Sequence, residues 1–282
     1  MVPCLLLSEH GRWHPCGDHG WEETERSLLA PGPMRQVLHR PLVIVYGTLG
    51  PTPGGNEEPL PGDIGRVMQD VAVSIANKLF MRGHAVVKVL SVEEIDLTQG
   101  FPYTILEGSN VLLVGGPRYN SAAAALLPGT TARRSSLSYY TPSQQQKRLP
   151  PCQPSSGAAT AFTFGGRCHR EPGTGLLLHG LLDTTPGSEL VSDTRKLMAS
   201  GQGRGRNGCN SGLPALFALV DGTDAAGLQA AASMFPVEPN SHVPDYGVVS
   251  AANLAWQGAG GLLSAGYLGN LWEFRRDLSH PR

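Results

Sequence analysis

Short apolar runs recur along the first half of the chain, and two of the three end at glycine. They lie at 41–47 (PLVIVYG), 86–90 (VVKVL) and 110–116 (NVLLVGG), and continuous runs of this kind are typical of strands buried on both faces. Between the first two runs, apolar residues recur at the i, i+3/i+4, i+7 spacing of a helix that begins at Asp63 and ends with Gly83 at the C′ position. These apolar residues are Ile64, Val67, Met68, Val71, Ile75 and Leu79. The order strand, helix, strand predicts a βαβ unit and a parallel sheet.

The second half repeats this plan less regularly. Short apolar runs fall within 161–180, and 216–220 (LFALV) is the clearest late strand. The segment that follows it, 221–236 (DGTDAAGLQAAASMFP), predicts a capped, alanine-rich helix with a proline stop. Residues 246–250 (YGVVS) are expected to return to the sheet. The sequence therefore predicts an α/β fold: a mostly parallel sheet flanked by helices, with long loops rich in glycine and proline.

Composition supports one large domain with much loop. The 282 residues include 36 Gly and 23 Pro, which is close to double ordinary usage. We divide the chain into an irregular extension (1–38), a single α/β domain (39–275) and a short tail (276–282). Two polar stretches, near 129–160 and 186–212, are expected to be loose insertions in the domain.

Charge and cysteine content exclude several classes of function. A net charge of −1 provides no general field for nucleic acid, so nucleic-acid binding is not expected. No apolar run approaches the roughly 20 residues of a membrane-spanning helix, and the N-terminus is a poor signal peptide. Five cysteines form an odd set without metal-ligand spacing, which leaves room for one or two disulfides. We expect neither a metal nor a cofactor, and the compartment stays open.

The turn after the third apolar run is the first candidate site. It contains Gly115, Gly116, Arg118 and Asn120, and ligands in open α/β sheets gather beyond the carboxyl ends of strands. The spacings G-x-G-x-x-G and G-x-x-x-x-G-K-[ST] are both absent. The turn therefore has two interpretations, a structural turn and a ligand contact, and we favour the structural one.

A second candidate follows the run at 216–220. Asp221, Thr223 and Asp224 could contact a sugar or a metal at the end of this strand. Residues of these types more often cap the following helix by accepting hydrogen bonds from its free amides, a contribution of ~1 kcal/mol. Capping is the interpretation we favour.

Nucleophilic catalysis leaves only weak candidates. The G-x-S-x-G elbow of α/β-hydrolases is absent. The closest similarity is GCNSG, which offers Cys209 or Ser211 as a nucleophile, with a distant base such as His179. The glycine-rich C-terminal region contributes Trp256, Tyr267 and Trp272, which could line a carbohydrate-binding face or fill a packed corner. We favour packing for these aromatic residues.

A series of segments in a fixed order resembles a known type of domain. The segments are RPLVIVYGT, NVLLVGGPRYN, FTFGGR, PGTGLLLHG, LFALVDGTDAAGLQAAASMFP, VPDYGVV and GAGGLLSAGYLGNLWEF. Together, over about 41–274, they resemble the accessory α/β domain on the C-terminal side of secreted α/β-hydrolase-type proteins, the prolyl-oligopeptidase and polyester-depolymerase-like esterases. The resemblance implies a non-catalytic accessory or binding module, with a hydrolase domain, a partner protein, or a carbohydrate or polymer surface as partner.

Two alternatives to an accessory module stay open at this point. The first is a hydrolase of the esterase or peptidase class that uses an unrecognised nucleophile. The second is a nucleotide- or phosphosugar-binding α/β enzyme that uses the turn at Gly115 and Gly116.

Overall fold

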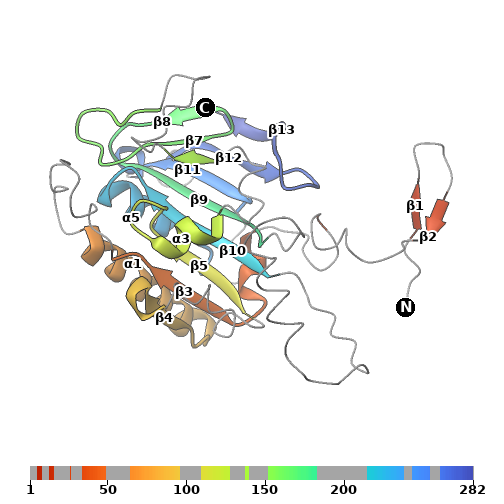
Figure 1. Cartoon of the computed structure of the whole chain (residues 1–282), viewed down its shortest axis with the longest axis horizontal. Coiled ribbons are helices and arrows are strands. Elements are labelled where there is room, and N and C mark those ends of the chain that lie inside the picture. The colour runs from red at the N-terminus through yellow and green to blue at the C-terminus, as the bar shows by residue number, and fades with distance from the viewer. Residues whose placement is uncertain are drawn as a thin grey trace.

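A computed structural model of the chain shows a large sheet with helices and a smaller sheet packed around it (Figure 1). The structure describes residues 5–7, 13–15, 26, 34–48, 64–95, 109–127, 137–139, 152–182, 215–237, 243–254 and 261–281. Among them, eight strands form the large sheet in the order β13-β12-β11-β9-β10-β5-β3-β4. Figure 1 shows this sheet running from β4 at its lower end to β12 and β13 at its upper end.

One half of the sheet is parallel, as the sequence predicts. Its strands are β3 (Leu42–Tyr46), β4 (Lys88–Ser91), β5 (Asn110–Val114) and β10 (Leu216–Gly222). β3 pairs with both β4 and β5, and β5 pairs with β10, each in the parallel sense. Helix α1 (Ile64–Gly83) connects β3 to β4, so the predicted βαβ unit is confirmed.

The other half is antiparallel, and the prediction of a mostly parallel sheet is therefore wrong. Its strands are β9 (Thr174–Leu181), β11 (Tyr246–Ser250), β12 (Leu262–Leu268) and β13 (Phe274–Pro281). β9 is antiparallel to both β10 and β11, and β12 is antiparallel to both β11 and β13. The sheet is mixed, and helices are few among the described residues.

The burial of β9 explains the error. All eight of its residues are buried, because α5 (Ala225–Ser233) packs on one face and the small sheet covers the other. An antiparallel strand that is covered on both faces has the same continuous apolar run as a parallel one. The pattern of hydrophobic residues therefore predicts the burial of β9 correctly but does not indicate whether the strand is parallel or antiparallel to its neighbours.

The two faces of the sheet are covered differently. Helices α1 and α5 contact each other and pack on one face; on it, Gly175 and Gly222 lie so close to the backbone of α5 that a Cβ atom would overlap it. The other face carries a three-stranded sheet of β6 (Ser138–Tyr139), β7 (Phe162–Phe164) and β8 (Arg167–His169). There, the Phe164 ring contacts the rings of Tyr246 and Phe274.

The remaining described elements are short. They are β1 (Leu5–Leu7) and β2 (Trp13–Pro15), which pair as an antiparallel hairpin, η2 (Met34–Leu38), η3 (Val92–Glu94), α3 (Ser121–Leu126) and η6 (Ala251–Asn253).

Helix α1 buries the face that its sequence pattern indicates, with one change at its end. Its buried residues are Ile64, Met68, Val71, Ala72, Ile75 and Leu79. Gly83 is still helical, and the left-handed residue is His84, with φ 50° and its amide donating to the Phe80 carbonyl at 3.0 Å. The C′ residue is thus His84 rather than the expected Gly83.

Two predicted boundaries can be compared with the described residues. β13 runs to Pro281, so the sheet continues past residue 275 into most of the predicted tail at 276–282. β6 lies within the predicted insertion at 129–160 and pairs with β7. The predicted insertion at 186–212 lies outside the described residues.

Candidate functional site

The two turns predicted as candidate sites meet at the carboxyl ends of β5 and β10. The Gly116 amide donates to Asp221 Oδ1 at 2.8 Å, across 105 residues of sequence. A Cβ atom at position 116 would overlap the Asp221 carboxylate and press on the Tyr139 ring, so only glycine fits there. The amide that would face an anionic ligand at this strand end already binds a carboxylate of the protein itself.

The Asp221 carboxyl and the Tyr139 hydroxyl form a buried pair beneath this turn. Asp221 is 2% exposed, and neither its Oδ2 nor the Tyr139 hydroxyl makes a hydrogen bond of regular geometry. Burial raises the pKa of Asp221, against the lowering effect of the Gly222 and Gly116 amides and of the nearby Tyr139 hydroxyl. Burial and the nearby Asp221 carboxylate likewise raise the pKa of Tyr139 well above its usual value. This pair favours its protonated forms and is closed off from solvent.

Both polar atoms of the Asn120 side chain make hydrogen bonds within the fold. Its Oδ1 accepts from the amides of Ala122 at 3.0 Å and Ala123 at 3.2 Å, which caps α3. Its Nδ2 donates to the carbonyls of Val45 and Val114, both at 3.0 Å. The residue is fully buried, and it ties the ends of β3 and β5 to the start of α3.

The other residues of the two turns also bind within the chain. Asp224 caps α5 through a 2.8 Å bond from the Gly227 amide, as favoured from the sequence, and its Oδ2 accepts from Gly173 at 2.8 Å. Thr223 is buried, and its hydroxyl donates to the Glu171 carbonyl at 2.8 Å. Arg118 Nη1 donates to the Ala159 carbonyl at 2.7 Å. Gly115, with φ 92°, packs against Met68.

His179 has a carboxylate partner that sequence reasoning missed. Asp245, which directly precedes β11, lies opposite His179, and the two side chains approach to 3.6 Å between Nδ1 and Oδ1. Asp245 Oδ2 pairs with the Arg26 guanidinium and accepts from the Leu268 amide at 2.8 Å. The Arg26 guanidinium lies 4.5 Å from the centroid of the Trp272 ring, and Trp272 meets the His179 ring edge-on. No spacing in the sequence could have revealed this cluster, because antiparallel pairing and a distant segment assemble it.

The electrostatics of this cluster favour a neutral imidazole. His179 is fully buried, and burial lowers its pKa from 6.5 to about 4, with Asp245 raising it and Arg26 lowering it. A neutral imidazole beside a carboxylate could accept a proton, but this one has no access to solvent. The candidate nucleophiles Ser211 and Cys209 lie outside the described residues.

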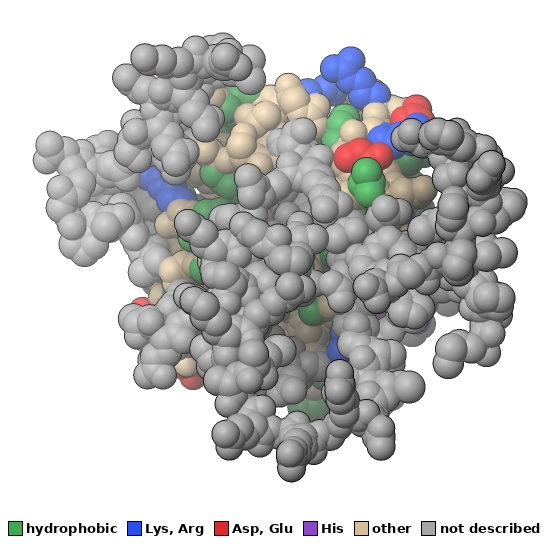
Figure 2. All heavy atoms as spheres, turned by 45° about the vertical axis from the view of Figure 1, so that its right-hand side comes forward, with side chains coloured by type: hydrophobic (Ala, Val, Ile, Leu, Met, Phe, Trp, Pro, Cys, Tyr) green, Lys and Arg blue, Asp and Glu red, His purple; other side chains and the backbone are tan. Residues whose placement is uncertain are grey.

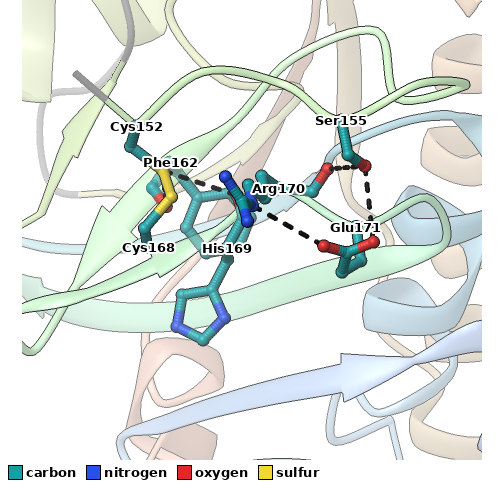
Figure 3. Close-up of a disulfide and its surroundings, with 7 residues drawn as sticks. All are labelled: Cys152, Ser155, Phe162, Cys168, His169, Arg170 and Glu171. Carbon is teal, nitrogen blue, oxygen red and sulfur yellow. Dashed lines mark hydrogen bonds and ion pairs between the residues drawn. A yellow bond between two sulfur atoms is a disulfide. The ribbon is translucent and has the colours of Figure 1, made fainter. Parts of the chain in front are cut away.

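A disulfide joins Cys152 to Cys168, with the Cα atoms 5.5 Å apart. Figure 3 shows it beside Phe162, at one end of the loop that precedes β7. Further along that loop the Ser155 hydroxyl donates to the Arg170 carbonyl at 2.7 Å, and Arg170 pairs with Glu171 at 3.7 Å (Figure 3). His169 stacks on Phe162 at 5.1 Å, and burial lowers the pKa of His169 to about 4.

The hairpin of β12 and β13 presents an aromatic side chain to solvent. The register shifts between the pairs Gly266–Ser279 and Leu268–Phe274, which leaves Tyr267 opposite residues 275–278. Tyr267 is 48% exposed. We call the following exposed residues the hairpin patch: Tyr267, Leu271, Arg275, Arg276 and Leu278. Figure 2 shows basic, acidic and hydrophobic side chains close together along the upper edge of one face, the edge at which β13 lies in Figure 1.

The C-terminal aromatic residues thus divide between packing and exposure. Trp272 is fully buried, as the packing interpretation predicts, and its positive φ of 62° belongs to the turn between β12 and β13. Tyr267 is the exposed member, and Trp256 lies outside the described residues. Arg275 pairs with Asp277 on the adjacent strand surface, with Nη2 and Oδ2 2.6 Å apart.

Three further features of the described residues bear on function. A groove of about 890 Å³ runs along α1 and includes Thr48, Asp70 and Lys78; none of the predicted site residues lines it. Within the part of the chain that the structure describes, no group of three His, Cys, Asp or Glu side chains could hold a metal ion. None of the helices described there is both long and apolar enough to cross a membrane.

Comparison with known proteins gives no relative: no family model, curated protein or solved structure matches the chain. The resemblance to hydrolase-associated accessory domains therefore stays a prediction.

Proposed function

We propose that the chain is a non-catalytic binding module that contacts a carbohydrate polymer through the hairpin patch. The observation that carries this proposal is the half-exposed Tyr267 on an edge of the sheet, where the register of β13 shifts. A tyrosine offers an apolar ring face together with a hydroxyl. Sugars present the matching combination of C–H faces and hydroxyl groups.

The surroundings of Tyr267 suit a neutral, hydroxyl-rich ligand. Arg275 and Asp277 hold each other in an exposed two-point ion pair, through 3.0 and 2.6 Å hydrogen bonds. The pair offers donors and acceptors in a fixed geometry while its charges offset each other. Leu271 and Leu278 add apolar surface at 47% and 41% exposure. The predicted association with polymer-degrading hydrolases agrees with this ligand class.

A panel of insoluble polymers tests the proposal. Purified chain is incubated with cellulose, chitin, amylose and an aliphatic polyester film, and the bound fraction is measured as a function of protein concentration. We expect saturable retention on at least one polysaccharide and at least a five-fold loss of affinity in Tyr267→Ala, which corresponds to about 1 kcal/mol.

The matched control removes another exposed aromatic ring. Phe80 on α1 is 55% exposed, and Phe80→Ala should bind like the unchanged protein. Retention on no polysaccharide, or an equal loss of affinity in both variants, would refute the proposal. If the chain were retained on the polyester film alone, the ligand would be a polyester and the carbohydrate proposal would be wrong.

A hydrolase is the second candidate, and the pairing of His179 with Asp245 is the observation that favours it. We place it second because the imidazole is buried and its pKa is low. A fluorophosphonate probe and a chromogenic short-chain ester test this alternative. Labelling and turnover that disappear in Ser211→Ala or His179→Gln would establish it in place of the binding module.

A further inference from the structure

The segment 152–161, which we call the strap, lies across both strand-end turns. It has no helix or strand of its own. The amides of Ala159 and Thr160 donate to the Thr223 carbonyl at 2.9 and 3.0 Å. From the other turn, Arg118 donates to the Ala159 carbonyl at 2.7 Å. The strap therefore joins the turn after β5 to the turn after β10.

The two turns that the strap joins also hold the buried groups of the strand ends, Gly116 and Asp221. Asp221 is 2% exposed, and its Oδ2 is buried without a hydrogen-bond partner among the described residues. A buried polar atom in this state is costly. Tyr139 of the small sheet lies beside this carboxyl, and the strap ties together the two turns that flank it.

The strap is held at its first residue by the Cys152–Cys168 disulfide. Figure 3 shows that the next attachment along the strap is Ser155, which bonds to the Arg170 carbonyl and faces Glu171. Both hydrogen bonds of the Ser155 hydroxyl lie at the surface, where water competes for them; the Ser155 amide also donates to the Arg170 carbonyl, at 3.1 Å. The covalent bond is thus the strong attachment at this end, and Cys168 is exposed to solvent.

We infer that the Cys152–Cys168 disulfide is a redox-sensitive latch that keeps the strap tied across the two turns that contain Gly116 and Asp221. A thiolate of a dithiol reductant attacks Sγ of Cys168, the more exposed of the two residues, and Cys152 leaves as a thiolate that takes up a proton. The second thiol of the reductant then resolves the mixed disulfide. Two electrons pass to the protein, which ends with two free thiols, and the reductant ends as a disulfide.

Opening the latch changes the strand end and leaves the sheet in place. Without the covalent attachment, the strap separates from the turns, its amide hydrogens exchange with solvent, and water reaches the Asp221 carboxyl. The hydrogen bond from the Gly116 amide to Asp221 then becomes accessible to solvent. This inference is independent of the hairpin patch, which lies on other strands.

Amide hydrogen exchange of the full chain, oxidised and then reduced with dithiothreitol, tests the latch. We expect exchange at Ala159, Thr160 and Gly116 to accelerate at least ten-fold on reduction, while amides of β3 keep their rates. The double variant Cys152→Ser, Cys168→Ser should show the fast rates without reductant and should not respond to it, which excludes the other cysteines as the cause.

Three results would overturn the inference. Mass spectrometry of the oxidised chain could find both thiols free. The strap and Gly116 could keep their exchange rates on reduction, in which case the hydrogen bonds alone hold the strap. Exchange could accelerate equally in β3, which would make the disulfide a stabiliser of the whole fold. Arg118→Met provides a second check, because it should increase the amide exchange rate at Ala159 by a larger factor in the reduced chain than in the oxidised chain.

Discussion

Replacing Asn120 tests whether the turn after β5 is built for stability. Its side chain makes four hydrogen bonds, two to amides of α3 and two to carbonyls of β3 and β5. Loss of the cap costs ~1 kcal/mol, and each buried bond to a strand carbonyl contributes about 1 kcal/mol. Asn120→Ala should therefore lower the free energy of unfolding by about 3 kcal/mol.

A second variant separates the two halves of this side chain. Asn120→Asp keeps the acceptor that caps α3 but replaces the Nδ2 donor with an oxygen that faces the Val45 and Val114 carbonyls. Its carboxyl must hold a proton to donate to either, so its pKa in the folded state should lie above the unfolded value. A raised folded pKa contributes stability that is fully present below the unfolded pKa and is lost as pH rises from there through the folded pKa. The deficit relative to the unchanged protein should thus be larger at pH 7.5 than at pH 5.

Urea unfolding followed by far-UV circular dichroism measures both variants. The unchanged protein is measured at each pH, so that other titrating groups cancel in the difference. A loss below 1 kcal/mol in Asn120→Ala, or a deficit in Asn120→Asp that is the same at both pH values, would refute the assigned bonds.

Three other predictions concern the buried cluster and α1. The folded pKa of His179 is about 4 and its ordinary value is 6.5, so between these pH values the unfolded chain binds a proton that the folded chain does not. The free energy of unfolding should therefore fall by up to about 3 kcal/mol as pH drops from 6.5 to 4. His179→Gln should reduce this fall, measured by urea unfolding at pH 7.5 and 5. Arg26→Met leaves the Asp245 carboxylate buried without its guanidinium, and should cost about 3–5 kcal/mol by chemical denaturation, of which Asp245→Asn in the same chain should restore part. Gly83→Ala should raise the free energy of unfolding by about 0.5–1 kcal/mol, because the site is helical with open space for a Cβ. His84→Gly should raise it by about 1 kcal/mol, because glycine adopts the left-handed conformation without strain. Thermal unfolding checks both variants, and lower melting temperatures would contradict the assignment of His84 as the C′ residue.

Local patterns predicted the elements well where one short segment determines the structure. The apolar spacing from Ile64 to Leu79 placed α1, and the run at 110–114 placed β5, because burial and periodicity are local properties. The cap at Asp224 followed from residue type and position. The direction of β9 did not follow, since burial on both faces removes the alternation that identifies an antiparallel strand.

Features assembled across the chain were beyond sequence reasoning. Asp245 faces His179 only because β9 and β11 pair antiparallel, and Arg26 reaches Asp245 from a distant segment. The Gly116–Asp221 bond joins two turns that were each proposed alone, and their meeting depends on the pairing of β5 with β10. The disulfide could not be assigned among five cysteines, because no spacing among them repeats.

The most direct test of the proposed binding module is a map of its contact surface. Amide hydrogen exchange is measured with and without a soluble oligosaccharide of whichever polysaccharide retains the chain. The account predicts protection confined to β12, β13 and the turn between them, and its loss in Tyr267→Ala. Protection along α1, protection at the turns after β5 and β10, or no protection at saturating oligosaccharide would contradict the assignment of binding to the hairpin patch.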